Sequence, residues 1–267
     1  MGVSYKKLFK LLIDRGMKKK DLRKIRGTGI SMIFQEPMTS LNPLMTCGRQ
    51  TVETIISHEK VIRAEAKERA LAMIRSVGIS RPEKVFSEVP AQLSGGMRQR
   101  IMIAMALICR PRLLICDEPT TALDVTVQAQ ILGLIRRLQK ETGTSVIFIS
   151  HDMGVISQMA DRVAVMYAGQ LVEYAEGEKI FTEPKHPYTQ GLQAAIPRLD
   201  EEKDTLRSIP GSVPMLYDLP KGCIFSPRCA HATERCRNER PALVENSGHL
   251  VRCFLYEENP SKGGTQA

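Results

Sequence analysis

Short apolar runs, each followed by a longer amphipathic or polar stretch, fill the first two thirds of the chain. The runs ISMIF, LLIC and SVIFIS begin at residues 30, 113 and 145, and each predicts a buried strand. The pattern also predicts helices over residues 63–77, 97–109, 125–142 and 153–160, and two strands about a glycine turn within residues 162–175. Strands that alternate with helices favour an α/β fold with a mostly parallel sheet.

The composition of the sequence changes near residue 183. Beyond it prolines recur, at positions 184, 187, 197, 210, 214, 220 and 227, and the hydrophobic runs become shorter. We therefore predict a main domain over residues 1–183 and an appended C-terminal region over residues 184–267.

Composition is that of an ordinary globular protein, with 43% hydrophobic and 25% charged residues in 267. We see neither an apolar run of membrane-spanning length nor a signal peptide, and therefore expect a cytoplasmic protein. Residues 1–26 hold ten basic and two acidic side chains, which is most of the net charge of +9. A solvated basic end is the favoured interpretation, and a patch for nucleic acid or an anionic membrane is the alternative.

Two carboxylates stand where the predicted strand LLIC ends. Asp117 and Glu118 would lie at the carboxyl edge of the sheet, where open parallel sheets bind ligands. One acid there can hold Mg²⁺ through water, and a second can polarise an attacking water. Many strands end in acids at a surface, so this pair alone is weak support for a site.

Three further groups have both a functional and a structural interpretation. Ser94, Gly95 and Gly96 open a helix, where backbone N–H groups can approach an anion, although Ser94 is equally an ordinary N-cap. His151 follows a buried strand and can reach a terminal phosphate, or it is a hydrogen-bonded surface histidine. Gln35 follows another strand and can reach a metal and a water, or it is a plain loop residue.

Four of the seven cysteines crowd the C-terminal end with the spacing C-x5-C-x6-C-x16-C, at Cys223, Cys229, Cys236 and Cys253. Four thiolates can hold zinc or an iron–sulfur cluster, and the alternative is a set of free buried thiols. The spacing fits no short zinc knuckle. Nearby basic residues would offset thiolate charge: Lys221, Arg228, Arg235 and Arg237.

Five motifs taken in order resemble the nucleotide-binding subunit of ABC transporters. They are IFQEP at 33–37, LSGGMRQR at 93–100, LLICDEP at 113–119, ALD at 122–124 and SHD at 150–152. EPMTSLNP, HPYTQGL, IPGSVP and LPKGCIFSPRC resemble the oligopeptide, dipeptide and nickel importers among them. The resemblance covers roughly residues 22–256.

The resemblance implies a P-loop NTPase-like fold with a helical subdomain at about residues 45–110. It implies a Q-loop at Gln35, a general base at Glu118 and a switch histidine at His151. It also implies contacts to ATP and Mg²⁺ by Ser94, Gly95, Gly96, Gln99, Asp117 and Asp124, with Asp117 serving the Mg²⁺. The first three of these would act on a nucleotide held by a partner subunit.

The resemblance also implies partners and a location. The partners would be a second ATP-binding subunit in a heterodimer, two transmembrane permease subunits and an extracytoplasmic substrate-binding protein, with no nucleic acid. The chain would lie peripherally at the cytoplasmic face of the inner membrane. For the four cysteines the resemblance favours a 4Fe-4S cluster, with zinc as the alternative.

The phosphate-binding motif G-x-x-x-x-G-K-[ST] does not occur in the sequence. We therefore expect a family member that lacks its N-terminal strand, phosphate loop and first helix. One interpretation is an ATPase subunit for peptide or nickel import, and another is a non-hydrolysing relic that acts in trans through its signature motif. A DNA-repair ATPase is a third, which the lack of coiled-coil heptads and the HPYT stretch disfavour.

Overall fold

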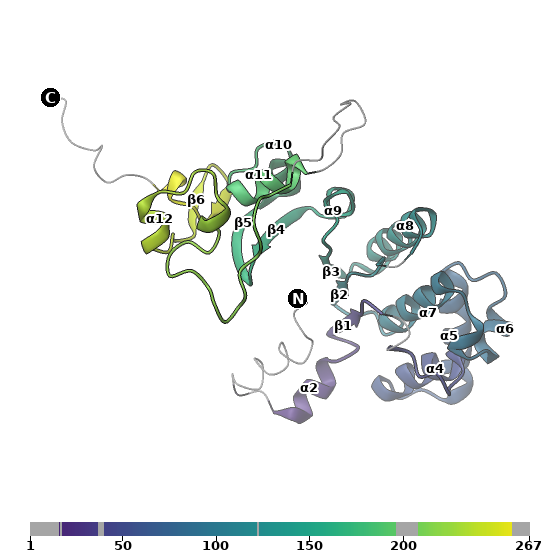
Figure 1. Ribbon diagram of the computed structural model, residues 1–267. Coiled ribbons are helices and arrows are strands. Elements are labelled where there is room, and N and C mark those ends of the chain that lie inside the picture. Colours follow the sequence, from purple (N-terminus) through teal and green to yellow (C-terminus); the bar gives the residue numbers. More distant parts are fainter. Residues whose placement is uncertain (1–15, 17, 37–39, 122, 196–207, 258–267) are drawn as a thin grey trace. The chain divides into compact units, whose positions relative to one another are not determined.

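The computed structural model describes residues 16, 18–36, 40–121, 123–195 and 208–257 (Figure 1). The chain divides into two compact units, with the division between His151 and Asp152. Residues 1–15 and 17, most of the basic N-terminal segment, lie outside the described residues, as does Ala122 of the ALD motif.

A three-stranded parallel sheet forms the centre of the first unit. Its strands are β1 (Ile30–Ile33), β2 (Leu113–Asp117) and β3 (Ser145–Ile149), in the order β1-β2-β3. All three strands were predicted, and their parallel pairing confirms the predicted type of sheet. Because the strands run the same way, the residues that follow β1, β2 and β3 emerge at one edge.

Helices fill the part of the first unit that was predicted as a helical subdomain. They are α4 (Cys47–His58), α5 (Arg63–Ser76), α6 (Pro82–Ser87), the 3₁₀ turn η1 (Pro90–Gln92) and α7 (Gly95–Leu107). The unit also contains α2 (Lys19–Ile25) and α8 (Val125–Thr142), and α7 contacts both β1 and α8 (Figure 1). Helix α4 was not predicted.

Side-chain caps fix where these helices begin. Thr46, Ser94 and Asp124 precede α4, α7 and α8, and each accepts a hydrogen bond from a backbone N–H in the first turn. Helix α8 ends at Gly143, whose φ of 68° lies in the left-handed region that glycine adopts without strain. The motif residues Ser94 and Asp124 therefore have structural roles of their own.

The second unit is built on an antiparallel sheet of order β4-β5-β7-β6. Strands β4 (Arg162–Tyr167) and β5 (Gln170–Glu176) precede the predicted boundary at residues 183/184, whereas β6 (Val244–Asn246) and β7 (His249–Val251) follow it. Strands from both sides of residues 183/184 therefore pair in one sheet, within the compact unit that begins at Asp152. The remaining elements are α9 (Met153–Met159), α10 (Gly177–Thr182), α11 (Pro187–Ala194), η2 (Ser226–Arg228), α12 (Glu234–Asn238) and η3 (Phe254–Tyr256).

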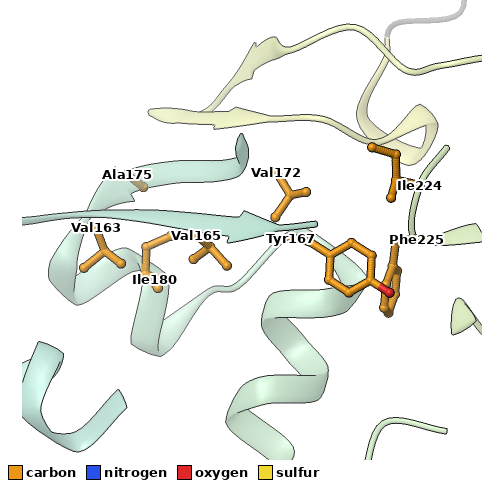
Figure 2. Close-up of a cluster of buried hydrophobic side chains, with 8 residues drawn as sticks. All are labelled: Val163, Val165, Tyr167, Val172, Ala175, Ile180, Ile224 and Phe225. Carbon is orange, nitrogen blue, oxygen red and sulfur yellow. The ribbon is translucent and has the colours of Figure 1, made fainter. Parts of the chain in front are cut away.

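A hydrophobic core holds this second unit together (Figure 2). It consists of Val163, Val165, Tyr167, Val172, Ala175, Ile180, Ile224 and Phe225. The rings of Tyr167 and Phe225 meet edge to face with centroids 5.2 Å apart. This contact ties the β4–β5 hairpin to the cysteine-bearing segment that begins at residue 223.

Candidate functional site

Glu118 lies directly after β2 in an uncommon backbone conformation. Its φ is 45°, in the left-handed region that residues with a side chain rarely adopt. Its N–H donates to the carbonyl of Ile149, at the end of β3, over 3.0 Å. The hydrogen bond to β3 stabilises this strained conformation, and strained backbone is common at functional sites.

Three side chains converge on the Glu118 carboxylate. Gln35 Nε2 donates to Oε2 over 2.8 Å, and Thr121 Oγ1 donates to the same oxygen over 2.9 Å. His151 Nδ1 lies 3.2 Å from Oε1. Gln35, Glu118 and His151 follow β1, β2 and β3, so the sheet brings together three of the predicted site residues.

Thr121 was not predicted. It lies in the turn after β2, where its N–H also bonds the Glu118 carbonyl over 3.2 Å. A hydroxyl three residues after an acid in a turn is a signal that could have found it.

Hydrogen bonds set the charge state of this group. Those from His151 and then Thr121 hold the pKa of Glu118 below its usual range. Burial, and then the charge of Glu118, raises the pKa of Asp117. Glu118 is therefore a carboxylate at neutral pH, able to accept a proton, and the His151 side chain beside it is 74% exposed.

In the signature segment, LSGGMRQR at residues 93–100, Ser94 and Gly95 are exposed. The Ser94 hydroxyl accepts from Met97 N over 3.3 Å, and within the described part of the chain Ser94 has no bond to the Glu118 group. A Cβ on Gly95 would come no nearer than 3.9 Å to Leu123, whereas one on Gly96 would lie 2.9 Å from Val127 Cγ1. Gly96 is thus needed for packing against α8, and Gly95 leaves the helix end open.

Two other predicted nucleotide contacts have different surroundings. Gln99 is 1% exposed, and its Nε2 has no hydrogen-bond partner among the described residues. Its side chain is buried in this chain, and its contact with a nucleotide stays a prediction. Asp124 is exposed, and its Oδ1 caps α8 by accepting from Val127 N over 2.9 Å.

The four C-terminal cysteines line one cavity of about 220 Å³, together with aromatic side chains that include Phe225 and Phe254. Cys223 N donates to the carbonyl of Cys236 over 2.8 Å, which holds two of the four side by side. Burial raises the pKa of the Cys223 and Cys229 thiols, and nearby backbone N–H groups, those of Phe225 and Ser226 at Cys223 and that of His231 at Cys229, oppose the rise. Burial also raises the pKa of the Cys253 thiol to about 11.

Four thiols that line one cavity are a donor set that an iron–sulfur cluster or a zinc ion can take. Among the described residues, no three His, Cys, Asp or Glu side chains are placed to hold one metal ion. Two of the basic residues predicted to offset charge have other partners. Arg228 bonds the carbonyls of Ile209 and Pro210, and Arg235 pairs with Glu239 and Glu257.

Family profiles match both parts of the chain. The profile "ABC transporter" matches residues 10–121, and "Oligopeptide/dipeptide transporter, C-terminal region" matches residues 172–236. The fold is that of an ABC ATP-binding domain.

Curated relatives give the family. The oligopeptide transport ATP-binding protein AppD of Bacillus subtilis is 55% identical over 239 residues, which are 89% of this chain and 73% of AppD. The dipeptide transport ATP-binding protein DppD of the same species is 49% identical over 240 residues, 90% of this chain and 72% of DppD. The chain belongs to the family of ATP-binding subunits of oligopeptide and dipeptide importers.

A solved structure supports the fold. The ATP-binding cassette MJ0796 in a dimeric post-hydrolysis state, bound to ADP and phosphate, superposes with a TM-score of 0.53 and 29% identity. The match covers 60% of this chain and 68% of that one.

Proposed function

We propose that this chain uses Glu118 as the general base for the ATP hydrolysis that drives peptide import. The family is one of ATPases, and its named relatives are transport ATP-binding proteins for oligopeptides and dipeptides. The observation that carries the proposal is the Glu118 carboxylate, fixed by Gln35, Thr121 and His151 at the carboxyl edge of the sheet.

The chemistry divides among these residues. Glu118 accepts the proton of the attacking water, which Gln35 orients, and His151 offers an exposed ring to the terminal phosphate. Asp117 would hold Mg²⁺, which neutralises phosphate charge when it is bound. His151 and Thr121 keep Glu118 deprotonated for this task.

The signature segment acts on a second subunit in this proposal. Ser94 and Gly95 are exposed at the start of α7, away from the Glu118 group, and suit a nucleotide that the partner holds. If the partner alone hydrolyses ATP, this chain is instead a non-hydrolysing subunit that works in trans. Nickel is the alternative cargo.

The remaining proposed partners follow from the family. The chain would bind two permease subunits at the cytoplasmic face of the inner membrane, with a substrate-binding protein outside. Among the helices of the described residues, none is both long and apolar enough to cross a bilayer. We also propose a 4Fe-4S cluster on the four cysteines rather than zinc, supported by the cavity that they line.

Glu118→Gln tests the general base. In the importer assembled with its partner subunits, steady-state ATP hydrolysis should fall about 100-fold or more, because the amide cannot accept the proton. Glu141→Gln, an exposed position on α8, is the matched control and should leave turnover unchanged. Full turnover of the Glu118→Gln complex would refute the proposal.

Ser94→Ala separates the two interpretations of the chain. Loss of turnover with Ser94→Ala but not with Glu118→Gln would favour the subunit that works only in trans. Loss with both would mean that the chain contributes to two sites. Ser145→Ala, at the exposed start of β3, is the control for the serine change.

A further inference from the structure

The Cys236 sulfur has a hydrogen-bonding partner on a side chain. It is Thr233, whose Oγ1 lies 3.3 Å from Sγ. At Cys223, Cys229 and Cys253 the groups that oppose the rise in thiol pKa are backbone N–H groups, which no side-chain substitution removes. The contact from Thr233 to the Cys236 sulfur can therefore be removed by changing one residue.

The geometry of Thr233 suits a donor to sulfur. Thr233 precedes α12, and its Oγ1 accepts the N–H of Cys236 over 3.4 Å. With the oxygen accepting from the backbone, the hydroxyl proton is free to point at Sγ. A thiolate has no proton to give, so the hydroxyl is the donor whenever Cys236 is deprotonated.

Arg235, a basic residue that lines the cavity, is held by other partners. Arg235 lines the same cavity, but its guanidinium pairs with Glu239 and Glu257 over 3.0 and 2.9 Å. It also stacks 3.9 Å from the centroid of the Phe254 ring. Arg235 thereby joins α12 to η3, the two segments next to Cys236 and Cys253, rather than offering its charge to a sulfur.

We infer that Thr233 is a positioning residue for Cys236, whose hydroxyl donates to the ligand sulfur, retains it on the iron–sulfur cluster and raises the cluster's reduction potential. The inference rests on the proposed cluster. A donor to sulfur stabilises the more negative, reduced form more than the oxidised form. It also holds the Cys236 side chain in one orientation toward the cavity.

The test compares Thr233→Val with Thr233→Ser in the full chain, reconstituted anaerobically with iron and sulfide. Valine keeps the shape of threonine and removes the hydroxyl, whereas serine keeps it. We expect the valine variant to have a lower midpoint potential in an EPR-monitored titration. We also expect it to lose iron to a chelator severalfold faster, while the serine variant matches the wild type.

The control is Thr182→Val, another exposed threonine of the second unit whose hydroxyl bonds a backbone carbonyl. A purely capping role for Thr233 would reduce iron content without moving the potential of the loaded chain, and that result would overturn the inference. Unchanged potential and unchanged iron loss would overturn it as well, with the cluster itself intact. A wild-type chain that takes up no iron and sulfide would refute the cluster, and the role of Thr233 with it.

Discussion

At the scale of single residues, the charge of Glu118 depends on neighbours that are distant in the sequence. Gln35 lies 83 positions away and His151 lies 33 positions away, yet both bond the same carboxylate. The sequence predicts their meeting because three parallel strands end at one edge. It does not predict which atoms bond, because the left-handed turn at Glu118 sets that geometry.

Thr121→Val should shift the pH dependence of hydrolysis. The Thr121 hydroxyl lowers the pKa of Glu118, so its removal raises that pKa. Glu118 then stays protonated up to a higher pH, so the acid limb of the pH–rate profile shifts to higher pH. The measurement is turnover of the assembled importer against pH, with Thr126→Val on α8 as the control. An unmoved acid limb would show that this bond does not tune Glu118.

Gly95 and Gly96 should respond differently to alanine. At Gly96 the new Cβ would meet Val127 at 2.9 Å, and we expect a loss of about 1–3 kcal/mol in the free energy of unfolding. At Gly95 the space is open, so Gly95→Ala should fold normally and lose turnover only in the complex. Urea denaturation of both variants checks the first point, and equal stabilities would contradict it.

At the scale of elements, prediction succeeded where a hydrophobic period was visible. Helix α8 was predicted with the bounds that it has, because its apolar face, its Asp124 cap and its Gly143 end agree. Helix α4 was missed because Gln50 and Thr51 are among its buried positions, which hides the period. Strands β6 and β7 are only three residues long, but the Ser247–Gly248 turn between them, with φ of 51° and 82°, is a hairpin signal.

The start of α11 should make the second unit sensitive to acid. His186 caps this helix, and burial lowers its pKa to about 4 from an ordinary 6.5. As the pH falls from 6.5 toward 4, His186 binds a proton in the unfolded chain but stays neutral in the folded chain. The free energy of unfolding therefore falls over this range, by about 3 kcal/mol at most.

His186→Asn isolates this contribution. Asparagine keeps an acceptor for the N–H of Tyr188, which His186 Nδ1 now accepts over 3.0 Å, but does not titrate. Urea denaturation at a series of pH values should show a shallower loss of stability below pH 6.5 in the variant than in the wild type. Parallel curves for the two proteins would rule out His186 as the source.

At the scale of the whole molecule, the motifs predicted the family, whereas the compact units divide elsewhere than at the change in composition near residue 183. The second unit begins at Asp152 because β4 pairs with β5, and β5 pairs with β7 some eighty residues later. Short strands leave no long-range signal in the sequence.

Nucleotide binding by the 267-residue chain alone should be weak. The sequence contains no phosphate-binding glycine loop, the element that supplies most backbone donors to a triphosphate. We expect no saturation at millimolar concentration in a titration with a fluorescent ATP analogue and Mg²⁺. Tight binding would instead indicate a phosphate site of another kind in these residues, and would favour hydrolysis by this chain itself.

The left-handed backbone at Glu118 lowers the stability of the fold, but the same residue supplies the carboxylate that we propose as the general base. Glycine at this position would relieve a strain of about 1–3 kcal/mol and would remove the carboxylate at the same time. We expect Glu118→Gly to melt at a higher temperature than the wild type and to be inactive in the assembled importer, which calorimetry and turnover can check. Directed evolution for heat resistance alone would therefore tend to erase this residue, and only a selection that makes growth depend on imported peptide would keep it.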